Sequence, residues 1–234
     1  TNAAREEIEK RLGRTEVGRK ILSYPHFVGT FQFFFDTFIA IPWLRSTGYP
    51  VNLVDNNIVL NNRWKSLKYG YRKFLEGKKK DCNVCAYDKE LGKVVIAKLK
   101  PETGTVQDVL RVIDESQKKG YFTYNEMLLF AAQAVDNYRD ISIGLQKHFP
   151  LVLIDEAQDT SSFQWKLIEK AFPVNGSTII QCFGDKNQAI FSEGAKQQGL
   201  EVFPRENHLI MSKSNRFNDA IAKLANTVAL DSEE

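Results

Sequence analysis

The chain has 234 residues, of which 43% are hydrophobic and 26% charged, and its formal net charge of +3 neither requires nor excludes a polyanionic partner. Its three cysteines are an odd number with one close pair, which argues against a secreted disulfide scaffold, and no apolar run approaches the length of a membrane span. Because the N-terminus reads as a charged helix and not as a signal peptide, we expect a cytoplasmic protein with no membrane partner.

The first sixty residues predict two helices and several short strands. Apolar residues at helical spacing indicate a helix over residues 3–12 and a second, very apolar helix over 33–44. The segment FVGTF, residues 27–31, is expected to be a short strand. Residues 51–60 are expected to form a strand, a turn at Asn56-Asn57 and another strand.

The middle of the chain predicts a basic helical stretch, a hairpin and two helices. Residues 61–80 are basic and expected to be helical, and residues 82–100 are expected to form a β-hairpin in which Gly92 supplies the turn. Further helices are expected over 103–120 and over 124–138.

The last third predicts strands that alternate with helices. Buried strands are expected over 152–155 and 177–185, a third strand over 207–212, and helices over 161–172 and 218–229. Near-continuous apolar strands in such alternation indicate a parallel sheet in an α/β layer. We therefore expect an α/β domain built from both ends of the chain, with the middle inserted as a second lobe.

Polar side chains follow the two apolar strands at the points where these strands end. Asp155 and Glu156 come directly after the first strand, while Asp185 and Gln188 follow the second. Neighbouring parallel strands would bring these four residues to one edge, where carboxylates can hold Mg²⁺ and orient a water beside a phosphate. The plainer alternative is that Asp155-Glu156 marks only where a core strand reaches solvent.

Several segments then carry a family resemblance. IDEAQDT followed by GDKNQAIF resembles motifs II and III of the UvrD/Rep type of superfamily 1 DNA helicases. In matching order, TNAAREEIEKRL is similar to motif Ia, GTFQFFF to motif Ib, GYFTYNEMLLFA to the helix before motif II, and SNRFNDAIAKLAN to motif IV. The resemblance covers residues 1–40 and 120–230, whereas the middle matches only in position and charge.

The resemblance implies an α/β fold with a RecA-like parallel sheet and flanking helices. Residues 1–44 and 126–234 would form the motor subdomain 1A, without its first strand and its P-loop. Residues 45–125 would form the inserted subdomain 1B, which is mostly helical, contains the β-hairpin and binds DNA.

The resemblance also implies ATP and Mg²⁺ as cofactors and gives roles to individual residues. Asp155, with Glu156, would hold the Mg²⁺ of the nucleotide, and Glu156 would activate the hydrolytic water. Gln188 would sense the γ-phosphate, and Arg216 would stabilise its developing charge. Single-stranded DNA would pass over Asn2, Thr30, Phe31 and Gln32.

Each of these residues also has a plainer interpretation. Gln188 can be a turn residue and Arg216 a surface cation. Asn2 can be a helix cap and Phe31 a core residue.

The sequence departs from the family pattern at three places. No segment fits the P-loop G-x-x-x-x-G-K-S/T, so we expect an internal piece of a longer motor that does not hydrolyse ATP alone. Gln32 stands where motif Ib usually has His. Ser192-Glu193 stands where an aromatic and an Arg usually follow motif III, which puts the usual base-stacking contact in doubt.

The segment RWKSLKYGYRKFLEGKKK, residues 63–80, contains eight Lys or Arg, one acid and interleaved aromatic rings. It predicts either a surface for a nucleic acid strand or an amphipathic helix with buried rings and a solvated face. In either case Lys78, Lys79 and Lys80 are expected to contact DNA. Nearby, Cys82 and Cys85 have zinc-knuckle spacing, but no second ligand pair exists, so two free thiols are favoured over zinc.

Three functions are therefore weighed. The leading one is an ATP-dependent helicase or translocase, 3′-to-5′ by resemblance, that acts on single-stranded DNA or a single-strand/duplex junction in repair, recombination or anti-phage defence, with a nuclease or another protein subunit as a further partner. The second is a non-catalytic helicase-like module that binds DNA or protein. The third, a metal-dependent nuclease, lacks an evident ligand cluster.

Overall fold

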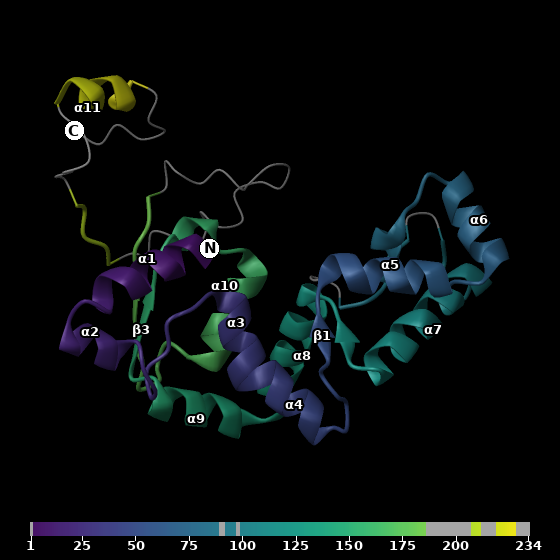
Figure 1. The fold of residues 1–234 in the computed structure, drawn as a ribbon, viewed down its shortest axis with the longest axis horizontal. Coiled ribbons are helices and arrows are strands. Elements are labelled where there is room, and N and C mark those ends of the chain that lie inside the picture. Colours follow the sequence, from purple (N-terminus) through teal and green to yellow (C-terminus); the bar gives the residue numbers. More distant parts are fainter. Residues whose placement is uncertain (1, 89–91, 97–98, 186–206, 212–218, 228–234) are drawn as a thin grey trace.

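The computed structural model describes residues 2–88, 92–96, 99–185, 207–211 and 219–227, without the side chains of residues 2–5, 219, 225 and 226. Two lobes lie side by side along the long axis of the molecule (Figure 1). The lobe that contains β3 and β4 comprises α1 (Asn2–Leu12), α2 (Glu16–Ile21), α3 (Phe31–Phe35), the π-helical turn η1 (Asp36–Ala40), α4 (Ile41–Ser46), α8 (Tyr124–Asn137), α9 (Arg139–His148), β3 (Leu151–Ile154), the 3-10 turn η3 (Ala157–Asp159), α10 (Ser162–Ala171) and β4 (Ile179–Cys182). Helix α11 (Asp219–Asn226) lies apart from these elements (Figure 1). The other lobe comprises α5 (Asn56–Ser66), α6 (Tyr69–Gly77), the 3-10 turn η2 (Cys82–Cys85) and α7 (Gly104–Lys118), and β1 (Leu53–Val54) and β2 (Tyr121–Phe122) lie between the lobes.

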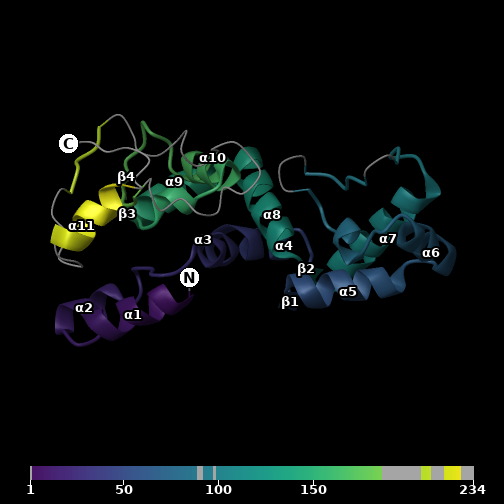
Figure 2. The same ribbon diagram turned by 90° about the horizontal axis from the view of Figure 1, so that it is seen from above.

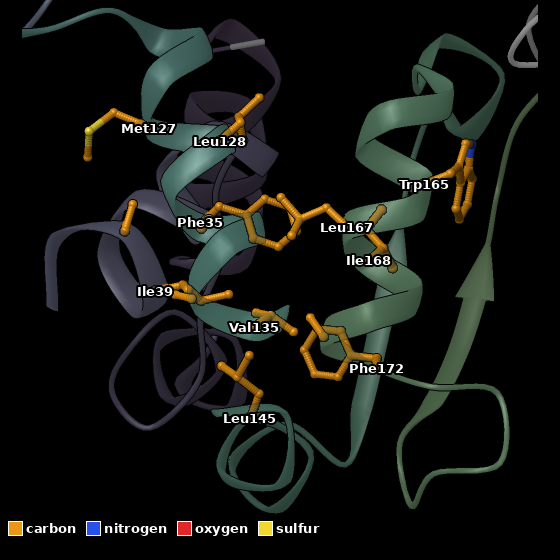
Figure 3. Packing of buried hydrophobic residues seen from close by; sticks show 14 of the residues in the cluster. Phe35, Ile39, Met127, Leu128, Val135, Leu145, Trp165, Leu167, Ile168 and Phe172 are labelled. Atoms are coloured by element: carbon orange, nitrogen blue, oxygen red, sulfur yellow. The ribbon is translucent and has the colours of Figure 1, made fainter. Parts of the chain in front are cut away.

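Each lobe has its own hydrophobic core. In the first, α3 and η1 pack against α8, and α8 packs against α10, so that Phe35 and Ile39 approach Val135 and Phe172 (Figure 3). In the second, buried side chains of α5, α6 and α7 surround Cys85. The 90° view shows α6 at the end of the molecule farthest from β3 (Figure 2).

The predicted helices are present, and side-chain caps explain where several of them begin. Thr123 and Glu126 form a capping box at the start of α8, and Ser161 and Gln164 form another at the start of α10. Helix α7 ends as expected before Gly120, which has a φ of 79°. Among the described helices, none is both long and apolar enough to cross a membrane.

Two strand predictions near the N-terminus are wrong because a helix cap takes their place. The Thr30 side chain accepts a hydrogen bond from Phe33 N, so the chain enters a helix at Phe31 and FVGTF forms no strand. The Asp55 side chain likewise caps α5 by accepting from Ile58 N, which removes the predicted turn and second strand after Val54.

The hairpin over 82–100 and the third strand over 207–212 are also not observed in the described residues. Gly92 does make a turn, with a φ of 61°, and Asp88 N donates to Lys93 O at 2.9 Å. However, the described residues from Cys82 to Lys100 form η2 and loops, with no strand. Residues 207–211 have no regular structure, and Ser212 lies outside the described residues.

The predicted parallel pairing of the two C-terminal strands is confirmed, but their full burial is not. Strands β3 and β4 are parallel neighbours, with Leu151 opposite Ile179 and Ile154 opposite Cys182. One face packs on the core, while Leu151, Leu153 and Ile179 on the other face are 53%, 58% and 68% exposed. Within the described residues this sheet consists of these two strands.

Candidate functional site

The carboxyl ends of β3 and β4 lie at one edge, and backbone hydrogen bonds join the segments that follow them. Phe183 N donates to Ile154 O at 2.8 Å, and Ala157 N donates back to Phe183 O at 2.9 Å. The loop after β3 is therefore held against the segment after β4. This places Asp155, Glu156 and Asp185 at a common edge, as the alternation of strands and helices predicts.

Glu156 turns the chain from β3 into η3 with a left-handed backbone. Its φ is 51° and its ψ is 44°, a conformation that costs a residue with a Cβ about 1–2 kcal/mol. Strain of this kind persists only where the surrounding structure enforces it, and it often accompanies functional loops. Here the two backbone bonds to Phe183 supply that enforcement.

Gln158 joins the two loops through its side chain. The amide is buried; its Nε2 donates to Glu156 Oε2 at 2.6 Å, and its Oε1 accepts from Asp185 N at 3.2 Å. One side chain thus fixes the direction of the Glu156 carboxylate relative to the loop after β4. Gln158 has no role in the prediction from sequence, although an amide that can donate and accept, two residues after Glu156, was the available signal.

The carboxylates of this edge have different surroundings. Asp155 and Glu156 are exposed, and the Asp155 side chain forms no hydrogen bond or ion pair with another described residue. Burial, and then the charge of Glu156, raise the pKa of Asp159. All three carboxylates are exposed, and Asp159 differs from the other two in this raised pKa.

The two exposed carboxylates, Asp155 and Glu156, fit a cation that takes most of its ligands from water or from a phosphate and not from the protein. Within the described residues, no group of three or more His, Cys, Asp or Glu side chains could hold a metal. Two exposed carboxylates suit Mg²⁺, which keeps several waters and is bound in proteins through one or two carboxylates plus phosphate oxygens. The edge can therefore accept a hydrated or phosphate-bound Mg²⁺, but it is not a closed metal cage.

Two residues assigned to this site fall outside the described residues. These are Gln188 and Arg216, so their predicted places beside Asp155 and Glu156 stay predictions. Asn2 begins α1, and its side chain is not described.

The other residues of the predicted DNA path lie together at the start of α3. Thr30 caps the helix, and the partly buried Phe31 packs against the first core. Gln32 Nε2 donates to Asp36 Oδ1 at 2.7 Å. Burial raises the pKa of Asp36 to about 6, against the opposing effect of that hydrogen bond. Each of these side chains thus has a structural contact, and a role on DNA stays a prediction.

The three predicted DNA-binding lysines lie at the C-terminal end of α6. Lys78 is the C-cap, Lys79 has a φ of 55°, and Lys79 and Lys80 line a surface hollow of about 320 Å³. Both views place this end far from β3 (Figures 1 and 2). Close by, Cys82 and Cys85 are free thiols, and burial raises the pKa of Cys85 to about 12, which keeps it protonated.

Comparison with known proteins gives the following matches. The sequence profile described as the UvrD/REP helicase N-terminal domain matches residues 56–206, more than half of the chain. The RecBCD enzyme subunit RecB of Mycolicibacterium smegmatis is 32% identical over 88 residues, which are 37% of this chain and 8% of that protein. The ATP-dependent DNA helicase Rep of Buchnera aphidicola subsp. Schizaphis graminum is 30% identical over 115 residues, which are 47% of this chain and 17% of that protein.

A third relative couples a helicase with a nuclease in its name. The exonuclease/helicase subunit RexA of Lactococcus lactis subsp. cremoris is 28% identical over 88 residues, 38% of this chain and 7% of that protein. The chain therefore spans less than a fifth of the length of these curated relatives.

Proposed function

The chain belongs to the UvrD/REP helicase N-terminal domain family, and from this premise we propose that it is part of an ATP-dependent translocase or helicase that moves 3′-to-5′ on single-stranded DNA. Residues 1–44 and 126–234 then contribute to motor subdomain 1A, and residues 45–125 form the inserted subdomain 1B. The separate hydrophobic cores of the two lobes support this division.

One observation carries the proposal more than any other. The loops after β3 and β4 are bonded to each other at the carboxyl edge of a parallel pair, through the Glu156–Gln158–Asp185 bridge. A pair of strands whose ends are tied in this way can transmit a change at one loop to the other. A motor needs this property if the state of its bound nucleotide is to change its affinity for DNA.

The chain's own residues have defined tasks at this edge. When bound, the Mg²⁺ of the nucleotide would neutralise charge on the phosphates. Asp155 holds the cation, and Glu156, oriented by Gln158, accepts a proton from the attacking water. Gln188 and Arg216 complete the site as γ-phosphate sensor and as the cation that balances developing charge.

On the DNA side, the first turn of α3 and the end of α6 are the proposed contacts. Asn2, Thr30, Phe31 and Gln32 line the path of the single strand. Lys78, Lys79 and Lys80 contact phosphates at a single-strand/duplex junction.

The cellular setting is proposed from the printed names of the relatives. These name RecBCD and exonuclease/helicase subunits, which suggests DNA repair, recombination or anti-phage defence in the cytoplasm and a nuclease or another subunit as partner. An alternative is a non-catalytic helicase-like module that binds DNA or protein.

Substitution of Glu156 in the full-length protein tests the proposal. We expect Glu156→Gln to lower DNA-stimulated ATP hydrolysis by at least about 100-fold, because the amide cannot accept the proton, while ATP binding is kept. Hydrolysis is measured by phosphate release, and binding by equilibrium titration with a fluorescent ATP analogue. The control is Glu169→Gln on the exposed side of α10, which is expected to retain the wild-type rate.

The same measurement separates the two functions. Hydrolysis by Glu156→Gln at the wild-type rate would remove Glu156 from its role. A wild-type protein that binds DNA but neither binds nor hydrolyses ATP would establish the non-catalytic module.

A further inference from the structure

The structure divides the aromatic residues of the basic segment into two groups. Trp64 packs against the second core, and the hydroxyl of the half-buried Tyr71 lies against the α7 helix start at Gly104. In contrast, the Tyr69 and Phe74 side chains of α6 are 67% and 42% exposed. The sequence left open whether these rings are buried or available to a ligand. In the structure, Trp64 and Tyr71 pack against the protein, whereas Tyr69 and Phe74 are accessible to a ligand.

Cations surround the two exposed rings. Arg72 Cζ lies 6.0 Å and Lys73 Nζ 5.8 Å from the centre of the Tyr69 ring, and Lys78 Nζ lies 5.8 Å from the centre of the Phe74 ring. Tyr69 and Phe74 are five residues apart, so they project from different sides of α6, and we call these two ring–cation clusters together the α6 aromatic surface. Exposed rings beside cations form a surface that is complementary to a polyanion with flat apolar groups.

The local charge is positive even after ion pairing. Glu76 contacts Lys73 at 2.9 Å and Arg72 at 3.9 Å, so one carboxylate is shared by two cations. Lys78 adds a further positive charge at the helix end, and Lys79 and Lys80 follow it. The excess positive charge makes an acidic ligand favourable.

The surface of α6 is open at Gly70, which lies on the same side of the helix as Phe74. Gly70 precedes Phe74 by one helical turn, and a side chain added at Gly70 would meet no other atom within 4 Å. Beyond Lys78, the hollow of about 320 Å³ has Val84 and Val95 in its lining next to Lys79 and Lys80. The helix surface at Gly70 is thus open to an approaching group.

We propose that the α6 aromatic surface binds single-stranded DNA, with unpaired bases stacked on the Tyr69 and Phe74 rings and phosphates held by the neighbouring cations. This inference rests on the proposed function in one respect: both take DNA as the ligand of this protein. Single strands are favoured over duplex because paired bases are already stacked on each other and cannot lie on the rings. Since α6 lies at the far end from β3, this contact is separate from the strand path at α3 (Figure 2).

The test measures DNA affinity of the full-length protein without nucleotide, by fluorescence anisotropy of a labelled oligo-dT and of a duplex of equal length. We expect Tyr69→Leu combined with Phe74→Leu to weaken oligo-dT binding by ~10-fold or more, because each base loses its stacking partner. Tyr69→Phe, which keeps the ring, is expected to retain oligo-dT binding. Ile58→Ala serves as the matched control, because Ile58 is 50% exposed on α5 of the same lobe.

Salt dependence distinguishes stacking from charge. The double leucine variant is expected to keep the slope of log affinity against log salt, whereas Lys78→Gln is expected to lower its magnitude by about 0.7. Wild-type oligo-dT affinity in the double variant, or an equal loss for the duplex, would overturn the proposal. The oligo-dT binding assay contains no ATP, so its outcome does not depend on whether Glu156→Gln lowers ATP hydrolysis. Likewise, the hydrolysis result does not depend on whether the α6 aromatic surface binds oligo-dT.

Discussion

Gln158 is the residue on which the geometry of the candidate site depends most directly. The loop after β3 contains the strained backbone of Glu156. The carboxylate of Glu156 is held in place by the buried side-chain amide of Gln158. The same amide accepts a hydrogen bond from the backbone of Asp185. Loss of this side chain would therefore remove the side-chain link between the two loops, while the backbone bonds at Phe183 and both exposed carboxylates would remain.

The first prediction concerns this bridge. We expect Gln158→Leu to lower the free energy of unfolding by about 1–3 kcal/mol, because the partly buried N–H of Asp185 loses its acceptor. Amide hydrogen exchange at Asp185 is expected to become faster, which mass spectrometry or NMR would detect. Gln133→Leu, at an exposed position on α8, is expected to change stability by less than about 0.5 kcal/mol. Unchanged exchange at Asp185 would show that the bridge does not hold the second loop.

Sequence reasoning reached Asp155 and Glu156 because an apolar run followed by acids marks a strand end in the sequence itself. It could not assign Gln158, because the partner of Gln158 Oε1 is a backbone N–H 27 residues away. Which backbone groups meet at that point depends on strand register, and register is a tertiary property.

At the level of elements, the two wrong strand predictions near the N-terminus share one cause. The segments 27–31 and 51–60 contain residues that suit strands, but Thr30 and Asp55 each bond the backbone three residues later and begin a helix. Local side-chain capping thus outweighed strand propensity, which depends on a partner strand to be realised. The long helices α7 and α8 were predictable because their apolar spacing extends over several turns.

A buried polar network joins the elements of the two lobes. Arg63 of α5 donates to Glu126 of α8 at 2.9 Å, and both side chains are fully buried. The Glu126 carboxylate also accepts from Gln117 Nε2 and from the backbone and hydroxyl of Thr123. Arg63 also donates to Cys85 O at 3.0 Å, while its Nε has no partner in the described structure. A buried charge pair therefore helps to fix the orientation of α5 on α8.

The second prediction tests that pair. We expect Arg63→Met to lower the free energy of unfolding by about 3–5 kcal/mol, because Glu126 is left as an uncompensated buried charge. The double variant with Glu126→Met is expected to lose less than the sum of the two single variants, since neither charge then remains unpaired. Urea unfolding of the full-length protein measures each variant. Lys118→Met provides the contrast: its pair with Asp114 is exposed, and we expect a loss below about 1 kcal/mol.

At the scale of the whole molecule, the two ends differ in chemistry. The carboxylates after β3 lie in one lobe, and the cations and exposed rings of α6 lie at the far end of the other (Figures 1 and 2). The net charge of +3 does not reveal this separation, because it sums regions of opposite sign. Clustering along the sequence did reveal it, since residues 63–80 contain eight cations and one acid. The placement of that cluster relative to β3 required the tertiary structure.

The last prediction follows from this separation. Substitution of Lys78, Lys79 and Lys80 by Gln in the full-length protein is expected to weaken DNA binding and to flatten its salt dependence. Removal of each cation that neutralises a phosphate lowers the magnitude of the slope by about 0.7 for single strands and about 0.9 for duplex. ATP hydrolysis without DNA is expected to stay at the wild-type rate, because the lysines lie far from Asp155 and Glu156.

A matched control uses lysines whose charge is already neutralised by a neighbour. Lys118 and Lys170 pair with Asp114 and Asp136 at 2.6 and 2.7 Å, so their substitution by Gln is expected to leave the salt slope of DNA binding unchanged. Affinity titrations at several salt concentrations, with single-stranded and duplex DNA, measure the slopes. If the triple variant kept the wild-type slope on both DNAs, the end of α6 would be a solvated surface, and the phosphate contacts would have to lie elsewhere on the protein.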